Sequence, residues 1–191
     1  MKFLLLAAIP LATSLLFAPA ASAGDLSYTY LEAGYDMTDL DHTGTDAEGW
    51  RLGGSAALGS QFFLFGSYTA NDLDDLPVDV DVTRIGFGWH TALADRHDLV
   101  LQANWLEADV GGGVVSASVD GYEAEVGVRS ALTPNFETYA ALGWVDSDDA
   151  DGELYGKLGA QYRFNATWGI TATATLGEDV TELFVGPRIS F

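Results

Sequence analysis

The stretch Arg84-Ile85-Gly86-Phe87-Gly88-Trp89-His90 decides the fold of this chain. Large apolar residues fill every second position, and glycine or a polar residue fills the positions between them. Successive side chains of a β-strand point to opposite faces, so this spacing predicts a strand with one wholly apolar face. The stretch from Leu99 to Trp105 repeats the pattern, with Gln102 and Asn104 on the polar face. The chain is therefore expected to be built from strands.

Alternating stretches of this kind recur along the chain, separated by polar, Gly-rich or Asp-rich segments. Ten of them can be counted, at residues 26–36, 50–58, 62–70, 84–90, 99–105, 122–129, 136–144, 153–164, 170–176 and 182–191. No segment after residue 23 has the spacing of a helical face, and none is apolar over the roughly 20 residues that a membrane-spanning helix needs. The sequence predicts an all-β chain of ten strands, with eight as the alternative count.

The polar face of these strands separates a membrane barrel from a soluble sandwich. A solvated sheet face would be rich in Lys and Glu, whereas this one carries Gly, Ser, Thr, Gln, Tyr and isolated charges of both signs. That composition is typical of a barrel lumen. Tryptophans lie near the ends of the apolar faces, as in interfacial girdles, at Trp50, Trp89, Trp105, Trp144 and Trp168. We expect an antiparallel transmembrane β-barrel of the Gram-negative outer membrane.

The N-terminal residues have the pattern of a secretory signal peptide. Lys2 precedes an apolar region from Phe3 to Phe17 that Pro10 interrupts, and Ala21-Ser22-Ala23 supplies the small residues of a cleavage site. An anchor helix is the less favoured alternative. We expect residues 1–23 to be a cleaved signal peptide and residues 24–191 to form the barrel. An even number of strands would leave both termini in the periplasm.

Charge is distributed unevenly along the chain, which has 28 Asp or Glu against 8 Lys or Arg. Five segments contain most of the acids and no Lys or Arg, at residues 36–48, 71–81, 107–120, 146–153 and 177–182. We expect these segments to be long extracellular loops, alternating with short periplasmic connections and a longer one at 92–98. The acidic surface excludes nucleic acid as a partner. The lack of cysteine excludes disulfides and thiolate metal sites.

The basic residues of the strands fall on lumen-facing positions, beside acids that could pair with them. We expect a charge network that comprises Glu32, Arg51, Arg84, Glu123, Glu125, Arg129, Glu137, Lys157, Arg163 and Arg188. Arg129 is expected to pair with Glu123 or Glu125. Because charges inside a narrow barrel must be paired to be tolerated, the favoured interpretation is that they pack the lumen. The alternative is a charged constriction in a water-filled pore.

Enzymatic chemistry finds little support in the sequence. Only His42 is expected on the outer side, because His90 and His97 lie at the periplasmic end. We expect no catalytic activity and no cofactor. The acidic run at 146–153 fails the EF-hand pattern, yet weak divalent binding remains a hypothesis beside that of a solvated loop, with candidate ligands Asp146, Asp148, Asp149 and Asp151. Calcium or magnesium could bridge these acids to anionic lipopolysaccharide.

Four segments carry a family resemblance: Leu26 to Tyr35, Asp120 to Ser130, Asn135 to Tyr139 and Val185 to Phe191. They resemble the small outer-membrane barrels of xanthomonad-type bacteria, often labelled diffusible-signal or quorum-sensing-associated proteins and once proposed as elicitors of plant immunity. The resemblance implies the barrel fold and its location, and no catalytic residues. The C-terminal alternation also resembles the signal that the barrel-assembly machinery recognises, through Val185, Ile189 and Phe191.

The function that follows is a non-enzymatic outer-membrane protein whose acidic surface serves envelope stabilisation or surface interaction. The alternative is a narrow porin-like channel, and a lipid-modifying enzyme at the rim ranks lower. The sequence names no ligand and no transported solute.

Overall fold

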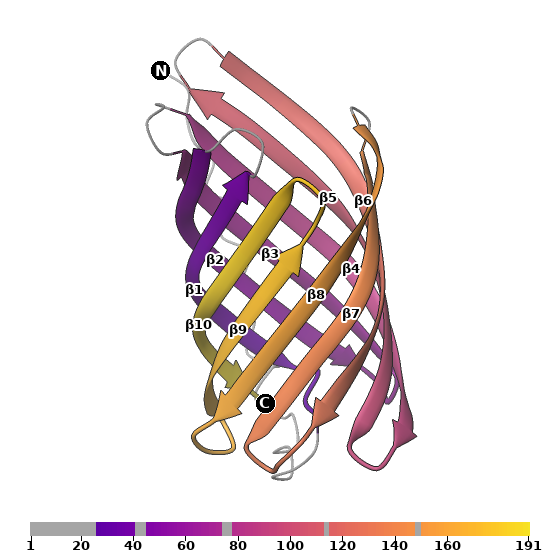
Figure 1. Ribbon diagram of the computed structural model, residues 1–191. Coiled ribbons are helices and arrows are strands. Elements are labelled where there is room, and N and C mark those ends of the chain that lie inside the picture. Colours follow the sequence, from indigo (N-terminus) through magenta and orange to yellow (C-terminus); the bar gives the residue numbers. More distant parts are fainter. Residues whose placement is uncertain (1–25, 41–44, 74–77, 113–114, 148–149) are drawn as a thin grey trace.

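The computed structural model is a closed barrel of ten antiparallel strands (Figure 1). The structure describes residues 26–40, 45–73, 78–112, 115–147 and 150–191, without the side chains of residues 40, 45, 115, 150 and 151. The strands are β1 (Tyr30–Leu40), β2 (Thr45–Leu58), β3 (Phe62–Leu73), β4 (Asp79–Ala94), β5 (His97–Gly112), β6 (Val115–Ala131), β7 (Phe136–Ser147), β8 (Ala150–Arg163), β9 (Trp168–Leu176) and β10 (Val180–Ser190).

Each strand pairs with its neighbours in the sequence, and β1 pairs with β10 to close the ring. The predicted barrel and its count of ten strands are confirmed, and the alternative count of eight is wrong. Closure matters physically because it leaves no unpaired sheet edge inside a bilayer, where water cannot satisfy the backbone. The described residues include no helix that is long and apolar enough to cross a membrane.

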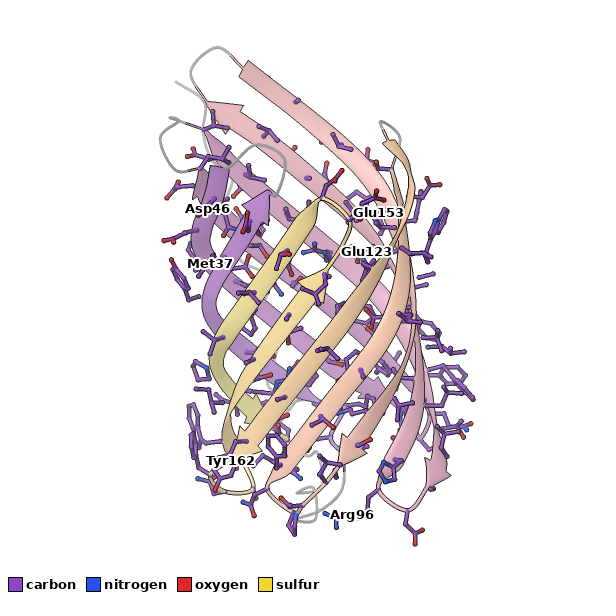
Figure 2. The ribbon with its side chains drawn as sticks, viewed as in Figure 1. Met37, Asp46, Arg96, Glu123, Glu153 and Tyr162 are labelled. Atoms are coloured by element: carbon purple, nitrogen blue, oxygen red, sulfur yellow. The ribbon has the colours of Figure 1, made fainter. Side chains whose placement is uncertain are left out.

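The two ends of the barrel differ. At one, here called the turn end, short turns join β2 to β3, β4 to β5, β6 to β7 and β8 to β9, and the chain ends there as well (Figure 1). Only Asp95 and Arg96 separate β4 from β5, so the longer connection predicted at 92–98 is wrong. Arg96 makes this tight hairpin possible by adopting a left-handed backbone with φ of 71°. Figure 2 shows it at the tip.

At the opposite end, here called the loop end, the predicted long loops are mostly strand. β4 begins at Asp79, β5 continues to Gly112 and β6 begins at Val115, so much of the segments 71–81 and 107–120 belongs to the sheet. The reason is that their acids alternate with apolar residues, as in Val78-Asp-Val-Asp-Val82. A carboxylate on the solvated side of a strand costs nothing in burial, so strand geometry survives an acidic composition.

The outward face of the barrel is apolar. Leu142 is 69% exposed and Leu158 is 56% exposed, values that suit lipid rather than water for side chains of this kind. Aromatic residues gather toward both ends of this face. The rings of Trp50 and Tyr68 pack together toward the loop end, with centroids 5.5 Å apart. Tyr162 lies toward the turn end (Figure 2). The predicted girdles and lipid-facing surface therefore have a structural basis.

One irregularity interrupts the seam between β1 and β10. Partner residues run up to Glu32 and Arg188 and resume at Tyr35 and Val185, leaving a gap opposite Pro187. Proline lacks the N–H that a ladder needs, so this interruption is the expected cost of placing it in a strand. Pro187 itself is exposed on the outward face of β10.

Candidate functional site

The lumen contains a cavity of about 400 Å³ that side chains from every strand line. Its wall combines hydroxyl and amide groups with charged residues, whereas the outer wall of the same strands is apolar. The site is therefore the inside of the barrel, and it divides into three levels from the loop end to the turn end.

The level nearest the loop end is built around Arg51. Its guanidinium pairs with Asp36 and with Glu182, and Asp36 is completely buried. Asn71 adds a hydrogen bond from Nδ2 to Asp36 Oδ1 at 3.1 Å. Arg84 extends the network, with 3.2 Å from Nη2 to the other oxygen of Glu182. This level forms a continuous chain of alternating charges across β1, β2, β4 and β10.

The middle level holds two separate clusters. Glu125 accepts from Lys157 Nζ at 2.5 Å and from the hydroxyls of Tyr139 at 2.5 Å and Tyr155 at 3.3 Å. Across the lumen, Arg188 Nε donates to Glu32 Oε2 at 2.8 Å. Buried charges are tolerated only when they are paired and hydrogen-bonded, and both acids meet that condition.

The level nearest the turn end is centred on Glu137. Its side chain is 3% exposed and lies between two arginines, with Arg129 Nη2 at 2.6 Å and Arg163 Nη2 at 3.1 Å. Glu137 therefore carries two cations, as Glu182 does, and its side chain is the more buried of the two. Losing it would remove the carboxylate partner of two buried guanidinium groups.

All ten residues of the expected charge network lie in these ion pairs, including Arg84 with Glu123 at 3.5 Å. One pairing is wrong, because Arg129 pairs with Glu137 instead of Glu123 or Glu125. Register explains the difference: Arg129 stands opposite Tyr139 on β7, and Glu137 lies two residues before Tyr139 on the same face. Asp36 and Glu182 were left out of the predicted network because each stands at the border between a predicted strand and an acidic segment. Their spacing of two residues from Gly34 and from Phe184 was the signal that could have placed them in the network.

The segment before β1 packs into the turn end of the lumen. Tyr28 is buried and stacks on His90 of β4 with ring centroids 3.7 Å apart, and its hydroxyl donates to Asp98 of β5 at 2.9 Å. Phe63 and Val100 pack against the same ring. Because at least two strands separate β1 from β4 and β5, the contacts with His90 and Asp98 reach across the turn end of the lumen.

A second contact fixes the same segment. Arg129 of β6 donates from Nη1 to the backbone carbonyl of Ser27 at 2.7 Å. The Ser27 hydroxyl in turn donates to the carbonyl of the C-terminal Phe191 at 3.0 Å. Residues 26–28 are therefore held at the turn end by contacts with β6 and with the C-terminal residue, and Tyr28 is part of the cavity lining there.

The candidate chemistry outside the lumen is sparse in the described part of the chain. His97 Nδ1 and Ser130 Oγ are 2.8 Å apart, but no carboxylate is placed to orient this histidine. His97 itself begins β5 instead of lying in a turn as predicted. His42 lies outside the described residues.

The divalent candidates can be placed only in part. Asp146 is exposed on the outer face of β7, while Asp148 and Asp149 lie outside the described residues, and the side chain of Asp151 is not described. Within the described ranges no group of three or more His, Asp or Glu side chains is arranged to hold a metal ion.

Comparisons with known proteins bear on the fold. No protein-family model matches the chain, and no curated protein matches it. Among solved structures, the KdgM porin is 12% identical over 85% of this chain and 99% of its own, with a TM-score of 0.51. A second structure, of the KdgM porin in complex with disordered oligogalacturonate, has a TM-score of 0.50 with the same identity and the same coverage of both chains. Neisserial surface protein A is 14% identical over 86% of this chain and 98% of its own, with a TM-score of 0.46. The chain therefore has the fold of the small outer-membrane β-barrel proteins.

Proposed function

We propose that this chain is a non-enzymatic barrel of the bacterial outer membrane whose lumen is closed at rest and whose loop end serves envelope stabilisation or surface interaction. The observation that carries the proposal is the block at the turn end. Tyr28 leaves the segment before β1, stacks on His90 of β4 and donates to Asp98 of β5, and these contacts support a lumen that is closed at the turn end. The resemblance to xanthomonad-type barrels in the sequence agrees with this role.

Orientation follows from the asymmetry of the ends. In outer-membrane barrels the short turns face the periplasm, and the longer connections face outward. The turn end with the C-terminus is therefore proposed to be periplasmic, and the acidic loop end extracellular. A reagent that cannot cross the membrane should label a cysteine at Asp46 on intact cells, but not one at Arg96. Labelling of the Arg96 position alone would reverse the assignment.

The direct test of the closed lumen is a conductance record. Refolded protein in a planar bilayer should give no steady conductance, because ion pairs and the Tyr28 block fill the path. Reproducible unitary steps from the unmodified chain would contradict the proposal and favour a channel.

A narrow channel is the second candidate, and the cavity favours it. About 400 Å³ is open in the lumen, and displacement of residues 26–28 would connect it to the turn end. The KdgM porin has been solved with oligogalacturonate, an acidic sugar polymer. Here every described lumen Lys or Arg pairs with a carboxylate, so a polyanion would find no free cation. Small cations, drawn by the acidic loop end, are the better-matched solutes.

We also propose two partners. Lipopolysaccharide would lie beside the outward acids of the loop end, bridged by calcium or magnesium, which bind oxygen ligands. The barrel-assembly machinery would recognise the outward side chains of β10, where Val185 and Phe191 are both exposed. Deleting Phe191 should reduce insertion into the outer membrane in cells, and unchanged insertion would remove the assembly role of that residue.

A further inference from the structure

The hairpin of β5 and β6 projects beyond the rest of the barrel at the loop end (Figure 1). Partners in β5 accompany β6 from Ser130 to Val115 without a break. Partners in β7 begin only at Gly121, which stands opposite Ser147 near the end of that strand. Residues 115–120 of β6 therefore have a pairing strand on one side only, among the residues that the structure describes.

The unpaired side can be assigned to particular residues. Ala131 N–H donates to the carbonyl of Arg96, on the β5 side of β6. Backbone groups of successive residues point alternately to the two sides of a strand, and the ladder to β5 has no bulge. Odd-numbered residues of β6 thus bond to β5, and Ser116, Ser118 and Asp120 direct their N–H and C=O groups to the open side.

The two faces of this projecting sheet differ in chemistry. The outward face carries Asp120 opposite Glu107, and Asp109 opposite both Ser118 and Asp81. The inward face is apolar, with Val119 opposite Ala108 and Val110 opposite both Ala117 and Val80. This reverses the polarity of the barrel wall below, where the outward face is apolar and the inward face polar.

Within the described ranges, the open edge of β6 lacks the usual protection against further pairing. Natural sheets blunt an edge with proline, lysine or a bulge, and residues 115–120 contain none of these. We propose that this edge binds an extended segment of a partner protein by strand addition, and that the segment alternates basic with apolar residues. Its basic side chains would lie beside Asp120, with Asp109 one strand further away on the same face, and its apolar ones beside Val119 and Ala117.

Charge complementarity selects this occupant. Pairing of two copies along the same edge would bring Asp120 and the acids behind it toward one another, and like charges on paired strands destabilise a sheet. A basic segment gains from the same acids, because residues 71–81 and 107–120 contain no Lys or Arg to compete. That the partner is an extracellular protein rests on the proposed extracellular placement of the loop end. Binding of a basic and apolar strand to the edge of β6 does not depend on that placement.

The test uses refolded protein in zwitterionic detergent and a labelled synthetic peptide that alternates Lys with Val. We expect saturable binding by fluorescence anisotropy. Ser118→Pro removes an edge N–H without removing a bond to β5, and should weaken binding by about tenfold or more. Ser118→Thr keeps the N–H and is the matched control, which should bind like the unmodified protein. Asp109→Asn with Asp120→Asn should weaken binding and flatten its salt dependence.

Two further peptides separate strand addition from simple charge attraction. The Lys and Val peptide with N-methylated amides keeps its charge but cannot join a ladder, and a Glu and Val peptide keeps the ladder but reverses the charge. Both should bind weakly. Equal binding of the methylated peptide, unchanged binding by Ser118→Pro, or a stable dimer of the protein alone would each overturn the proposal. None of these outcomes depends on whether the lumen conducts or on which end of the barrel faces outward. Failure of the peptide test can therefore be distinguished from failure of the proposed function.

Discussion

Arg129 of β6 and Glu137 of β7 share two hydrogen bonds, because both Nε and Nη2 of the arginine donate to the same carboxylate oxygen, at 3.2 Å and 2.6 Å. Glu137 is also the partner of Arg163. Because Glu137 lies between two guanidinium groups, replacing Glu137 and replacing Arg129 should have different effects on stability. Removing the acid takes the carboxylate partner away from two buried cations, whereas removing Arg129 leaves Glu137 paired with Arg163.

The first prediction follows from that inequality. Glu137→Ala should lower the free energy of unfolding by about 3–5 kcal/mol, as loss of one member of a buried pair usually does. Arg129→Ala should cost less, because Arg163 still neutralises Glu137. Urea titration of protein refolded in detergent, followed by the mobility shift between boiled and unboiled samples, measures both. Costs below about 0.5 kcal/mol for both variants would mean that water solvates this level.

The lumen shows how far the sequence could predict the site. Alternation alone placed Arg129 and Glu137 on lumen-facing positions, because a period of two fixes the face of every residue in a strand. It could not give the partner, which depends on the register between β6 and β7 and on the reach of each side chain. Asp36 was left out of the predicted network for another reason: it is the last residue of the predicted strand 26–36 and the first of the acidic segment 36–48, and its charge was counted with that segment. The block by Tyr28 was beyond prediction, because nothing in the residues before β1 indicates that they fold into the mouth.

The second prediction concerns a close approach inside the barrel wall. Gly143 of β7 stands opposite Tyr155 of β8, and a methyl group built on Gly143 would overlap the Tyr155 ring. That ring is 7% exposed and its hydroxyl bonds to Glu125, so it has little room to move. Gly143→Ala should cost about 1–3 kcal/mol of unfolding free energy, as overpacking typically does.

Gly156→Ala is the matched control for that substitution. It adds the same methyl group on the neighbouring strand, where nothing lies within 4 Å of the added atom. Its unfolding free energy should stay within about 0.5 kcal/mol of the original. Equal destabilisation by both alanines would show that glycine is needed in these strands for a reason other than the packing of Tyr155.

The third prediction addresses the block at the turn end. Tyr28→Ala removes the stack on His90 and the hydrogen bond to Asp98, and should open a path from the cavity to the turn end. Planar-bilayer records of this variant should show cation-preferring conductance steps that the unmodified protein lacks. Tyr162→Ala removes a tyrosine from the outward face near the same end and should show no conductance steps. A folded Tyr28→Ala barrel that also shows no conductance steps would mean that the ion pairs alone close the lumen.

The last prediction concerns the outward acids of the loop end, which face one another across neighbouring strands. Register places Asp39 opposite Asp46 and Asp72 opposite Asp79. Like charges in this arrangement destabilise the sheet. A hydrogen bond that protonated Asp79 donates to the Asp72 carboxylate, together with the charge of Asp72, raises the pKa of Asp79. Calcium or magnesium should relieve the repulsion and bridge the acids to lipopolysaccharide, so either ion should raise the melting temperature more in lipopolysaccharide-containing membranes than in zwitterionic detergent.

The controls for this effect use charge and pH. Replacing Asp146, Asp148, Asp149 and Asp151 with Asn should reduce the rise in melting temperature that divalent ions cause. Asp72→Asn with Asp79→Asn should also reduce it, because the repulsion between these two strands is then already removed.

Because the pKa of Asp79 is raised on folding, its protonation favours the folded state, so stability from this group is gained as pH falls through the raised pKa. The benefit of calcium should therefore fade over the same pH range. Exposed carboxylates are screened within about 8 Å at physiological ionic strength, so each contact is weak and the effect must be collective. If chelation leaves the melting temperature unchanged in both environments, the acids are solvated and the cation bridge is absent.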